Sequence, residues 1–115
     1  MAHSLSVDRS GLKGRARRAI IEQVRSLGQP CWLCGYPIDL SLDYQTHPLG
    51  STVDEVIPRS QGGDPLDITM CRHAHRVCNT VRGNRAPTDE VRAQCRAASD
   101  RARGQTSPAF RTREW

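Results

Sequence analysis

The chain has 115 residues, among them only one Phe, two Tyr and two Trp, and its mean hydropathy is −0.61. This length fits one domain with a thin apolar core, of the kind that often needs a metal or a disulfide for stability. No stretch is long and apolar enough to span a membrane, and the basic N-terminus lacks the apolar segment of a signal peptide, so we expect a cytoplasmic protein.

Positive charge is concentrated at the two ends of the chain. The net charge is +5, and sixteen of the seventeen basic residues are Arg, whose planar guanidinium suits phosphate. Residues 1–30 carry a net charge of +4, residues 31–70 carry −5 and residues 71–115 carry +6. An acidic centre between basic flanks fits a cation site within a phosphate-binding surface, although an Arg-rich coding bias would give the same arginine count.

The N-terminal part is expected to contain one helix. Residues 1–14 are polar and predicted to be disordered. From residue 15 to residue 27, Ile20, Val24 and Leu27 recur at helical spacing, and Gly28 and Pro30 follow as helix-ending residues. The arginines of this helix are expected mostly on its other faces: Arg17, Arg18 and Arg25.

Two short motifs predict a zinc site. Cys31 and Cys34 in "CWLCG" have the two-residue spacing of a zinc knuckle, and His75 and Cys78 in "HRVC" repeat it. Four such ligands form a closed tetrahedral site, which contributes on the order of 10 kcal/mol to folding. The alternatives are a redox pair, a disulfide or buried thiols. A redox pair lacks a βαβ context here, and a disulfide fits neither a cytoplasmic chain nor an odd cysteine count.

Three further residues compete for metal ligation or need another explanation. Cys71 and His73 lie close to the second pair, but neither has the two-residue spacing to Cys78. We therefore expect Cys71 to be a buried apolar residue. Cys95 lies on the apolar face of a later helix and is expected to be buried as well.

The segment between the two pairs is long enough to fold. Forty residues separate Cys34 from His75, about twice the loop of a simple zinc ribbon. The stretch "STVDEVIPRSQGG", residues 51–63, predicts a β-branched strand that runs into a turn. A second short strand is predicted near residues 68–70, and a helix after His75.

Two adjacent carboxylates, Asp54 and Glu55, lie in the middle of the first predicted strand. Because successive side chains of a strand point to opposite faces, one of them should point inward, where an unpaired charge costs several kcal/mol. The pair is therefore either the solvated edge of a hairpin or part of a site that faces a metal or a substrate.

The last helix has clear end signals. Thr88 is a good N-cap, acidic residues follow it in the first turn, and apolar residues recur at helical spacing up to Gly104. This pattern predicts a helix over residues 88–104. Residues 105–115 show no periodicity and are predicted to form a flexible tail.

The stretches "VDEVIPRSQGG", "DPLD" and "AHRVCNTVRGNR" resemble the HNH endonuclease family, and most closely its small phage-type members. The resemblance covers about residues 31–86. It implies an α+β fold with a small ββα-metal (His-Me finger) core and a structural zinc site. The two predicted helices flank this core, so that the HNH domain would span residues 15–104.

The resemblance also implies roles for residues. Asp54 and Asn79 would bind the catalytic cation, Mg²⁺ or Mn²⁺. Glu55 stands where the family commonly has His, so it is either the general base or a second ligand of the cation. Since glutamate is a weaker base than histidine near neutral pH, His47 in "THPLG" is the alternative base.

Two more expectations concern the rest of the motif. The family's middle Asn, which orients the base, falls near Met70 in this chain, and Met cannot take that role. The DNA backbone would be held by residues on and after the motif's helix: Arg76, Arg82, Asn84 and Arg85.

The resemblance implies a metal-dependent endonuclease that hydrolyses DNA phosphodiester bonds by nicking or double-strand cutting. Its DNA substrate and partners such as phage terminase or packaging proteins would place it in the cytoplasm of a phage-infected or prophage-carrying bacterial host. The alternative hypothesis is a non-catalytic zinc-ribbon module that binds DNA and carries a degenerate HNH motif.

Overall fold

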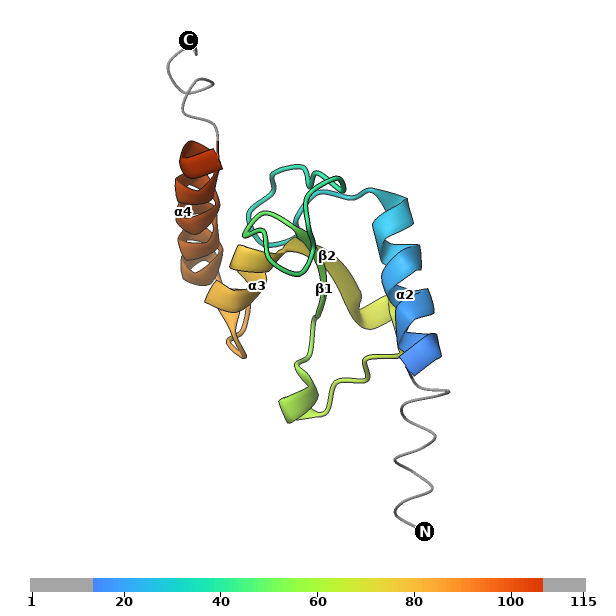
Figure 1. Ribbon diagram of the computed structural model, residues 1–115. Coiled ribbons are helices and arrows are strands. Elements are labelled where there is room, and N and C mark those ends of the chain that lie inside the picture. The colour runs from blue at the N-terminus through green and yellow to red at the C-terminus, as the bar shows by residue number, and fades with distance from the viewer. Residues whose placement is uncertain (1–13, 107–115) are drawn as a thin grey trace.

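The computed structural model describes residues 14–106 and has a two-stranded antiparallel sheet with helices on both sides (Figure 1). This confirms a small α+β fold. The predictions for residues 1–13 and 107–115 lie outside the described residues. Within the described part, no helix combines the length and apolar character needed to cross a bilayer.

The elements in chain order are α2 (Gly14–Leu27), β1 (Ser51–Glu55), the 3-10 helices η2 (Arg59–Gln61) and η3 (Ile68–Met70), β2 (Cys71–His75), α3 (Arg76–Arg82) and α4 (Asp89–Thr106).

The register of the sheet brings the acidic pair next to the second strand. Ser51 pairs with His75 at one end of β1, and Glu55 pairs with Cys71 at the other. Alternation along β1 directs Glu55 toward α2, where it contacts Arg17, and Asp54 toward α3, where it contacts Arg82. Strand β1 confirms the predicted strand.

The predicted second strand at residues 68–70 is wrong, because this segment forms η3 and β2 begins only at Cys71. The Asp67 carboxylate accepts hydrogen bonds from the Thr69 backbone N–H at 3.1 Å and from the Thr69 hydroxyl at 2.6 Å. This side-chain cap stabilises a tight turn, which here outweighs the β propensity of Ile68 and Thr69.

Helix α2 covers one face of the sheet and differs from the prediction in two side chains. Val24 is buried, as expected, but Leu27 is 63% exposed, because it is the last residue of the helix. Arg17 faces the sheet instead of the solvent. It lies seven residues before Val24, which places both side chains on one helical face.

Helix α4 runs to Thr106, so the predicted end at Gly104 is wrong, and so is the predicted start of a flexible tail at residue 105. A glycine inside a helix costs roughly 1 kcal/mol relative to alanine, which weakens a helix without ending it.

The core lies where the Cys31–Cys34 turn, β2, α3 and α4 meet. Cys71 and Cys95 are buried, which confirms both predictions. Two arginines of α4 bind the turn through its backbone: Arg92 donates to the Trp32 carbonyl, and Arg96 donates to the Cys34 carbonyl at 3.1 Å. The buried residues of this core are Cys31, Leu33, Cys34, Ala74, Cys78, Val91 and Cys95.

Candidate functional site

The four predicted zinc ligands form one buried cluster. The ligand atoms of Cys31, Cys34, His75 and Cys78 all lie within 4.8 Å of one another. Two sulfurs bound to one zinc at about 2.3 Å are roughly 3.8 Å apart in tetrahedral geometry, so these donors fit a zinc ion. His73 lies outside the cluster, as predicted, since its ring contacts the Ser51 hydroxyl at 2.8 Å and the Gln29 carbonyl at 2.7 Å.

Surrounding hydrogen bonds orient the ligands. The His75 Nε2 atom lies 3.1 Å from the Pro37 carbonyl oxygen, to which it can donate, and this leaves Nδ1 to face the thiols. The Cys31 Sγ atom accepts hydrogen bonds from the backbone N–H groups of Cys34 and His75 at 3.5 and 3.4 Å. Contacts of this kind fix the ligands of metal sites and stabilise thiolates.

The ionisation of the metal-free cluster differs from one ligand to the next. A hydrogen bond with Cys31 is the main reason that the pKa of the Cys34 thiol falls far below its usual range. Burial lowers the pKa of His75, but hydrogen bonds with Cys31 and Cys34 outweigh it and raise the pKa to about 9. Hydrogen bonds with Cys31 and Cys34, together with burial, raise the pKa of the Cys78 thiol. Without a metal the cluster therefore favours a Cys34 thiolate beside a protonated His75. Zinc binds thiolates and neutral imidazole, so its binding would displace protons from His75 and Cys78.

We predict about one zinc ion per chain. Cys34→Ala should lose this zinc and unfold the domain, because a site worth ~10 kcal/mol exceeds what a core of this size can replace. Metal content after purification and thermal unfolding by circular dichroism measure both effects. Cys71→Ala is the matched control: it removes another buried cysteine and should keep the zinc. A Cys34→Ala protein that is metal-free and as stable as the parent would contradict the zinc site.

A second feature is an open cavity at the Glu55 end of β1, with a volume of about 400 Å³. It brings Asp54 and Glu55 of β1 together with Asn79 of α3 and with Asn84, which follows that helix. His47, Arg76, Arg82 and Arg85 are not among its lining residues. The lining consists of Arg17, Val53, Asp54, Glu55, Pro58, Arg59, Ser60, Asn79, Gly83 and Asn84.

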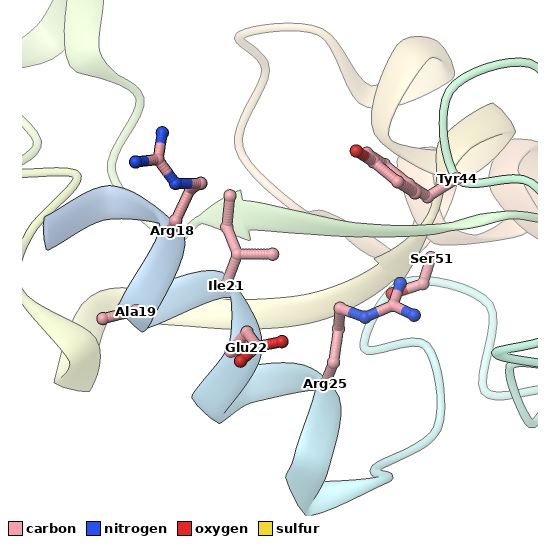
Figure 2. A pocket seen from close by; sticks show the side chains of 7 residues that line it. All are labelled: Arg18, Ala19, Ile21, Glu22, Arg25, Tyr44 and Ser51. Atoms are coloured by element: carbon pink, nitrogen blue, oxygen red, sulfur yellow. The ribbon is translucent and has the colours of Figure 1, made fainter. Parts of the chain in front are cut away.

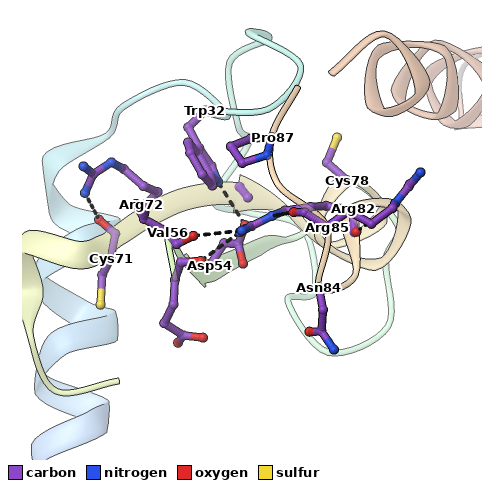
Figure 3. Close-up of polar contacts among 12 residues, drawn as sticks. Trp32, Asp54, Val56, Cys71, Arg72, Cys78, Arg82, Asn84, Arg85 and Pro87 are labelled. Carbon is purple, nitrogen blue, oxygen red and sulfur yellow. Dashed lines mark hydrogen bonds and ion pairs between the residues drawn. The ribbon is translucent and has the colours of Figure 1, made fainter. Parts of the chain in front are cut away.

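Asp54 points inward and is bound on one oxygen. Its Oδ2 atom accepts hydrogen bonds from Arg82 Nη1 at 2.8 Å and from Trp32 Nε1 at 3.1 Å (Figure 3). The guanidinium of Arg82 is 1% exposed, lies 5.3 Å from the centre of the Trp32 ring, and also donates to the backbone carbonyls of Glu55 and Val56. The prediction that Arg82 contacts DNA is therefore wrong, because its side chain is buried and bound within the protein.

The Glu55 carboxylate lies on the other face of β1 from Asp54, where its negative charge is paired with arginine side chains. Its Oε2 atom lies 2.6 Å from Arg17 Nη2 and 3.9 Å from Arg59. Neither Arg17 nor Trp32 was among the predicted site residues. The seven-residue spacing from Arg17 to Val24 would have placed Arg17 on the inward face of α2, whereas no local signal indicates that Trp32 binds Asp54.

Of the remaining predicted site residues, Asn84 lines this cavity and His47, Arg76 and Arg85 do not. His47 lies in the turn before β1, where its Nδ1 atom accepts a hydrogen bond from the Leu49 N–H at 3.0 Å. Arg76 donates to the Gln45 carbonyl at 2.8 Å and so binds the same loop. Arg85 is exposed, with its guanidinium bonded to the Val81 carbonyl at 2.6 Å, and Asn84 is exposed at the cavity wall.

No family model matches the chain, and neither a curated protein nor a solved structure matches it. Function must therefore be inferred from the residues and their geometry. The cavity combines oxygen donors, which hard cations such as Mg²⁺ prefer, with guanidinium groups, which bind phosphate.

The buried ion pair generates a prediction about stability. Arg82→Met should destabilise the protein by about 3–5 kcal/mol, because it leaves the Asp54 carboxylate buried without its partner. Adding Asp54→Asn should recover part of the loss, since the amide carries no charge. Urea unfolding of the two single variants and the double variant measures the coupling. An Arg82→Met protein as stable as the parent would show that the ion pair contributes nothing.

Proposed function

We propose that the chain is a metal-dependent endonuclease of the HNH type that hydrolyses DNA phosphodiester bonds. The observation that supports this most is that Asp54, Glu55 and Asn79 line one open cavity although they come from different elements. The cluster of Cys31, Cys34, His75 and Cys78 is connected to this cavity in two ways: Cys78 precedes Asn79 in α3, and Trp32, which follows Cys31, donates to Asp54. In this proposal β1, β2 and α3 form the ββα-metal core of the family.

The proposed cation site consists of Asp54 and Asn79. Both hydrogen bonds found for the Asp54 carboxylate fall on Oδ2, and among the described residues none is found to Oδ1. This oxygen and the Asn79 side-chain carbonyl are hard donors that fit Mg²⁺ or Mn²⁺. When bound, such a cation would stabilise the negative charge of the phosphate in the transition state.

Glu55 is the proposed general base. It lines the same cavity and would take the proton of the attacking water. Arg17 bonds to Glu55 and lines the cavity too, so it would orient the carboxylate and attract the scissile phosphate. His47 is the weaker candidate because it does not line the cavity. Asn84 at the wall and exposed Arg85 are the proposed contacts to the DNA backbone.

A specific observation favours a second candidate function, a zinc-containing DNA-binding module without catalysis. Each acid is paired with an arginine: Asp54 with Arg82 at 2.8 Å, and Glu55 with Arg17 at 2.6 Å. This pairing offsets the negative charge that would attract a second cation. Cleavage in the presence of divalent metal separates the two candidates.

We predict that the purified protein nicks supercoiled plasmid with Mg²⁺ or Mn²⁺ and not in their absence. Glu55→Gln should lower the rate roughly 10²–10⁴-fold, the usual range for a lost general base, while zinc content and DNA binding stay unchanged. If Glu55 is a ligand of the cation instead, added Mn²⁺ should restore the cleavage rate of the Glu55→Gln variant. Asn79→Ala should raise the cation concentration needed. Thr80→Ala, an exposed neighbour on α3, is the control.

Two outcomes would overturn this assignment. Absence of cleavage with every divalent cation, together with DNA binding, would favour the non-catalytic module. Cleavage by Glu55→Gln and Asn79→Ala at the parent rate would place the chemistry elsewhere. Asp54→Asn is preferable to Asp54→Ala in these assays, because the amide oxygen can still accept hydrogen bonds from Arg82 and Trp32.

Exposed Arg85 provides a prediction about DNA binding. Arg85→Ala should weaken binding and reduce the slope of log affinity against log salt by about one phosphate contact. Fluorescence anisotropy with labelled duplex DNA at several salt concentrations measures both. Arg101→Ala removes one exposed arginine from α4 and is the control. Identical slopes for Arg85→Ala and Arg101→Ala would exclude a specific role for Arg85.

A further inference from the structure

A second and larger cavity, of about 550 Å³, lies between α2 and the segment that leads into β1 (Figure 2). It shares no lining residue with the cavity around Glu55. Its size is within the range of pockets that hold small organic ligands. The lining consists of Arg18, Ala19, Ile21, Glu22, Arg25, Tyr44 and Ser51.

The lining combines the two properties needed to hold a nucleotide. Arg18 and Arg25 line the cavity from α2, about 10 Å apart along the helix, and Glu22 lies between them and offsets one of their charges, so the excess is positive (Figure 2). Ile21 and the Tyr44 ring provide apolar surface (Figure 2). Phosphate on the guanidinium groups and a base on the apolar surface would match this distribution.

Tyr44 is the residue suited to contact a base. It is 55% exposed although it is aromatic, and the guanidinium carbon of Arg25 lies 5.8 Å from the centre of its ring. At that distance a cation–π contact is weak. The ring is therefore available for stacking, and exposed aromatics between basic residues are typical of proteins that bind single-stranded nucleic acid.

The two cavities lie along the same strand. Ser51 lines the second cavity and Glu55 lines the first, at opposite ends of β1. Four residue steps of about 3.3 Å separate them by roughly 13 Å, a distance that a few nucleotides can span. The Ser51 hydroxyl is fixed by His73 Nε2 at 2.8 Å, so the end of this path is rigid.

We infer that the second cavity binds an unpaired nucleotide of a DNA strand, a few nucleotides from the phosphate at Glu55, with its base on Tyr44 and the neighbouring phosphates of the strand on Arg25 and Arg18. This inference rests on the proposed function for the nature of the strand. It adds that the protein holds single-stranded or locally opened DNA, because a paired base cannot enter a cavity of this kind.

The test is binding of a fluorescently labelled 12-nucleotide oligothymidylate by anisotropy, without added Mg²⁺ or Mn²⁺ so that no cleavage occurs. Tyr44→Ala should weaken binding about 5- to 150-fold, the range for the loss of one stacked base, and Tyr44→Phe should stay within about twofold of the parent. Unchanged zinc content and melting temperature show that each variant is folded. Competition by thymidine monophosphate distinguishes a free nucleotide from a strand.

Arg18 gives an independent measurement with little risk to folding, since it is exposed. Arg18→Gln should reduce the salt slope for the oligothymidylate by about 0.7, and Arg101→Gln, the matched loss of charge on α4, should not. Parent-like binding by Tyr44→Ala, equal slopes for Arg18→Gln and Arg101→Gln, or competition by the mononucleotide as strong as by the 12-mer would each overturn the inference. Binding that depends on Tyr44 in a protein that never nicks plasmid would support this site and overturn only the nuclease proposal.

Discussion

The cluster formed by Cys31, Cys34, His75 and Cys78 is the constraint on which the rest of the fold depends. His75 ends β2 and Cys78 lies in α3, so a metal held by both fixes the angle between strand and helix. Closing the forty-residue loop between the two pairs costs about 3 kcal/mol plus a constant. The core contains few large apolar side chains to offset that cost. A metal bound by this cluster would therefore take the place of a larger core.

The same cluster also organises the acidic cavity and the last helix. It holds the Cys31–Cys34 turn against the sheet, which brings the Trp32 indole to Asp54. Arg92 and Arg96 reach from α4 to the carbonyls of that turn, so α4 is bound to the turn that carries Cys31 and Cys34 through two backbone contacts. Disruption of the cluster would thus affect α4 as well as the cavity, although α4 supplies none of its four residues.

What the sequence predicted correctly follows from local rules. Ligand pairs at a fixed spacing, a β-branched run and an N-cap before a periodic segment depend on neighbours in the chain, and they gave the cluster, β1 and α4. The partners of Asp54 and Glu55 depend on which helices pack on each face of the sheet, and no local pattern carries that information. The second strand was predicted too early in the chain, because the side-chain cap of Asp67 competes with the β propensity of Ile68 and Thr69.

The net charge of the chain does not show how much positive charge is accessible at its surface. Arg17, Arg82, Arg92 and Arg96 all donate to acceptors within the protein, and the guanidinium carbon of Arg103 lies 4.2 Å from the centre of the Tyr36 ring. A net charge of +5 therefore overstates the positive charge that a phosphate backbone could reach. In the part of the chain that the structure describes, exposed arginines lie on α2, in η2, after α3 and on α4: Arg15, Arg18, Arg59, Arg85, Arg96 and Arg101.

The connection between the two strands has a consequence for how this chain tolerates insertions and deletions. In a tight β-hairpin the turn sets the register, but here fifteen residues join Glu55 to Cys71, too many to fix it. The register is set at the opposite end, where His75 is both the partner of Ser51 and a member of the cluster. Length changes in the connecting segment should therefore leave the pairing intact. One residue gained or lost between His75 and Cys78 would instead break the spacing of the ligand pair and rotate Arg82 of α3 away from Asp54.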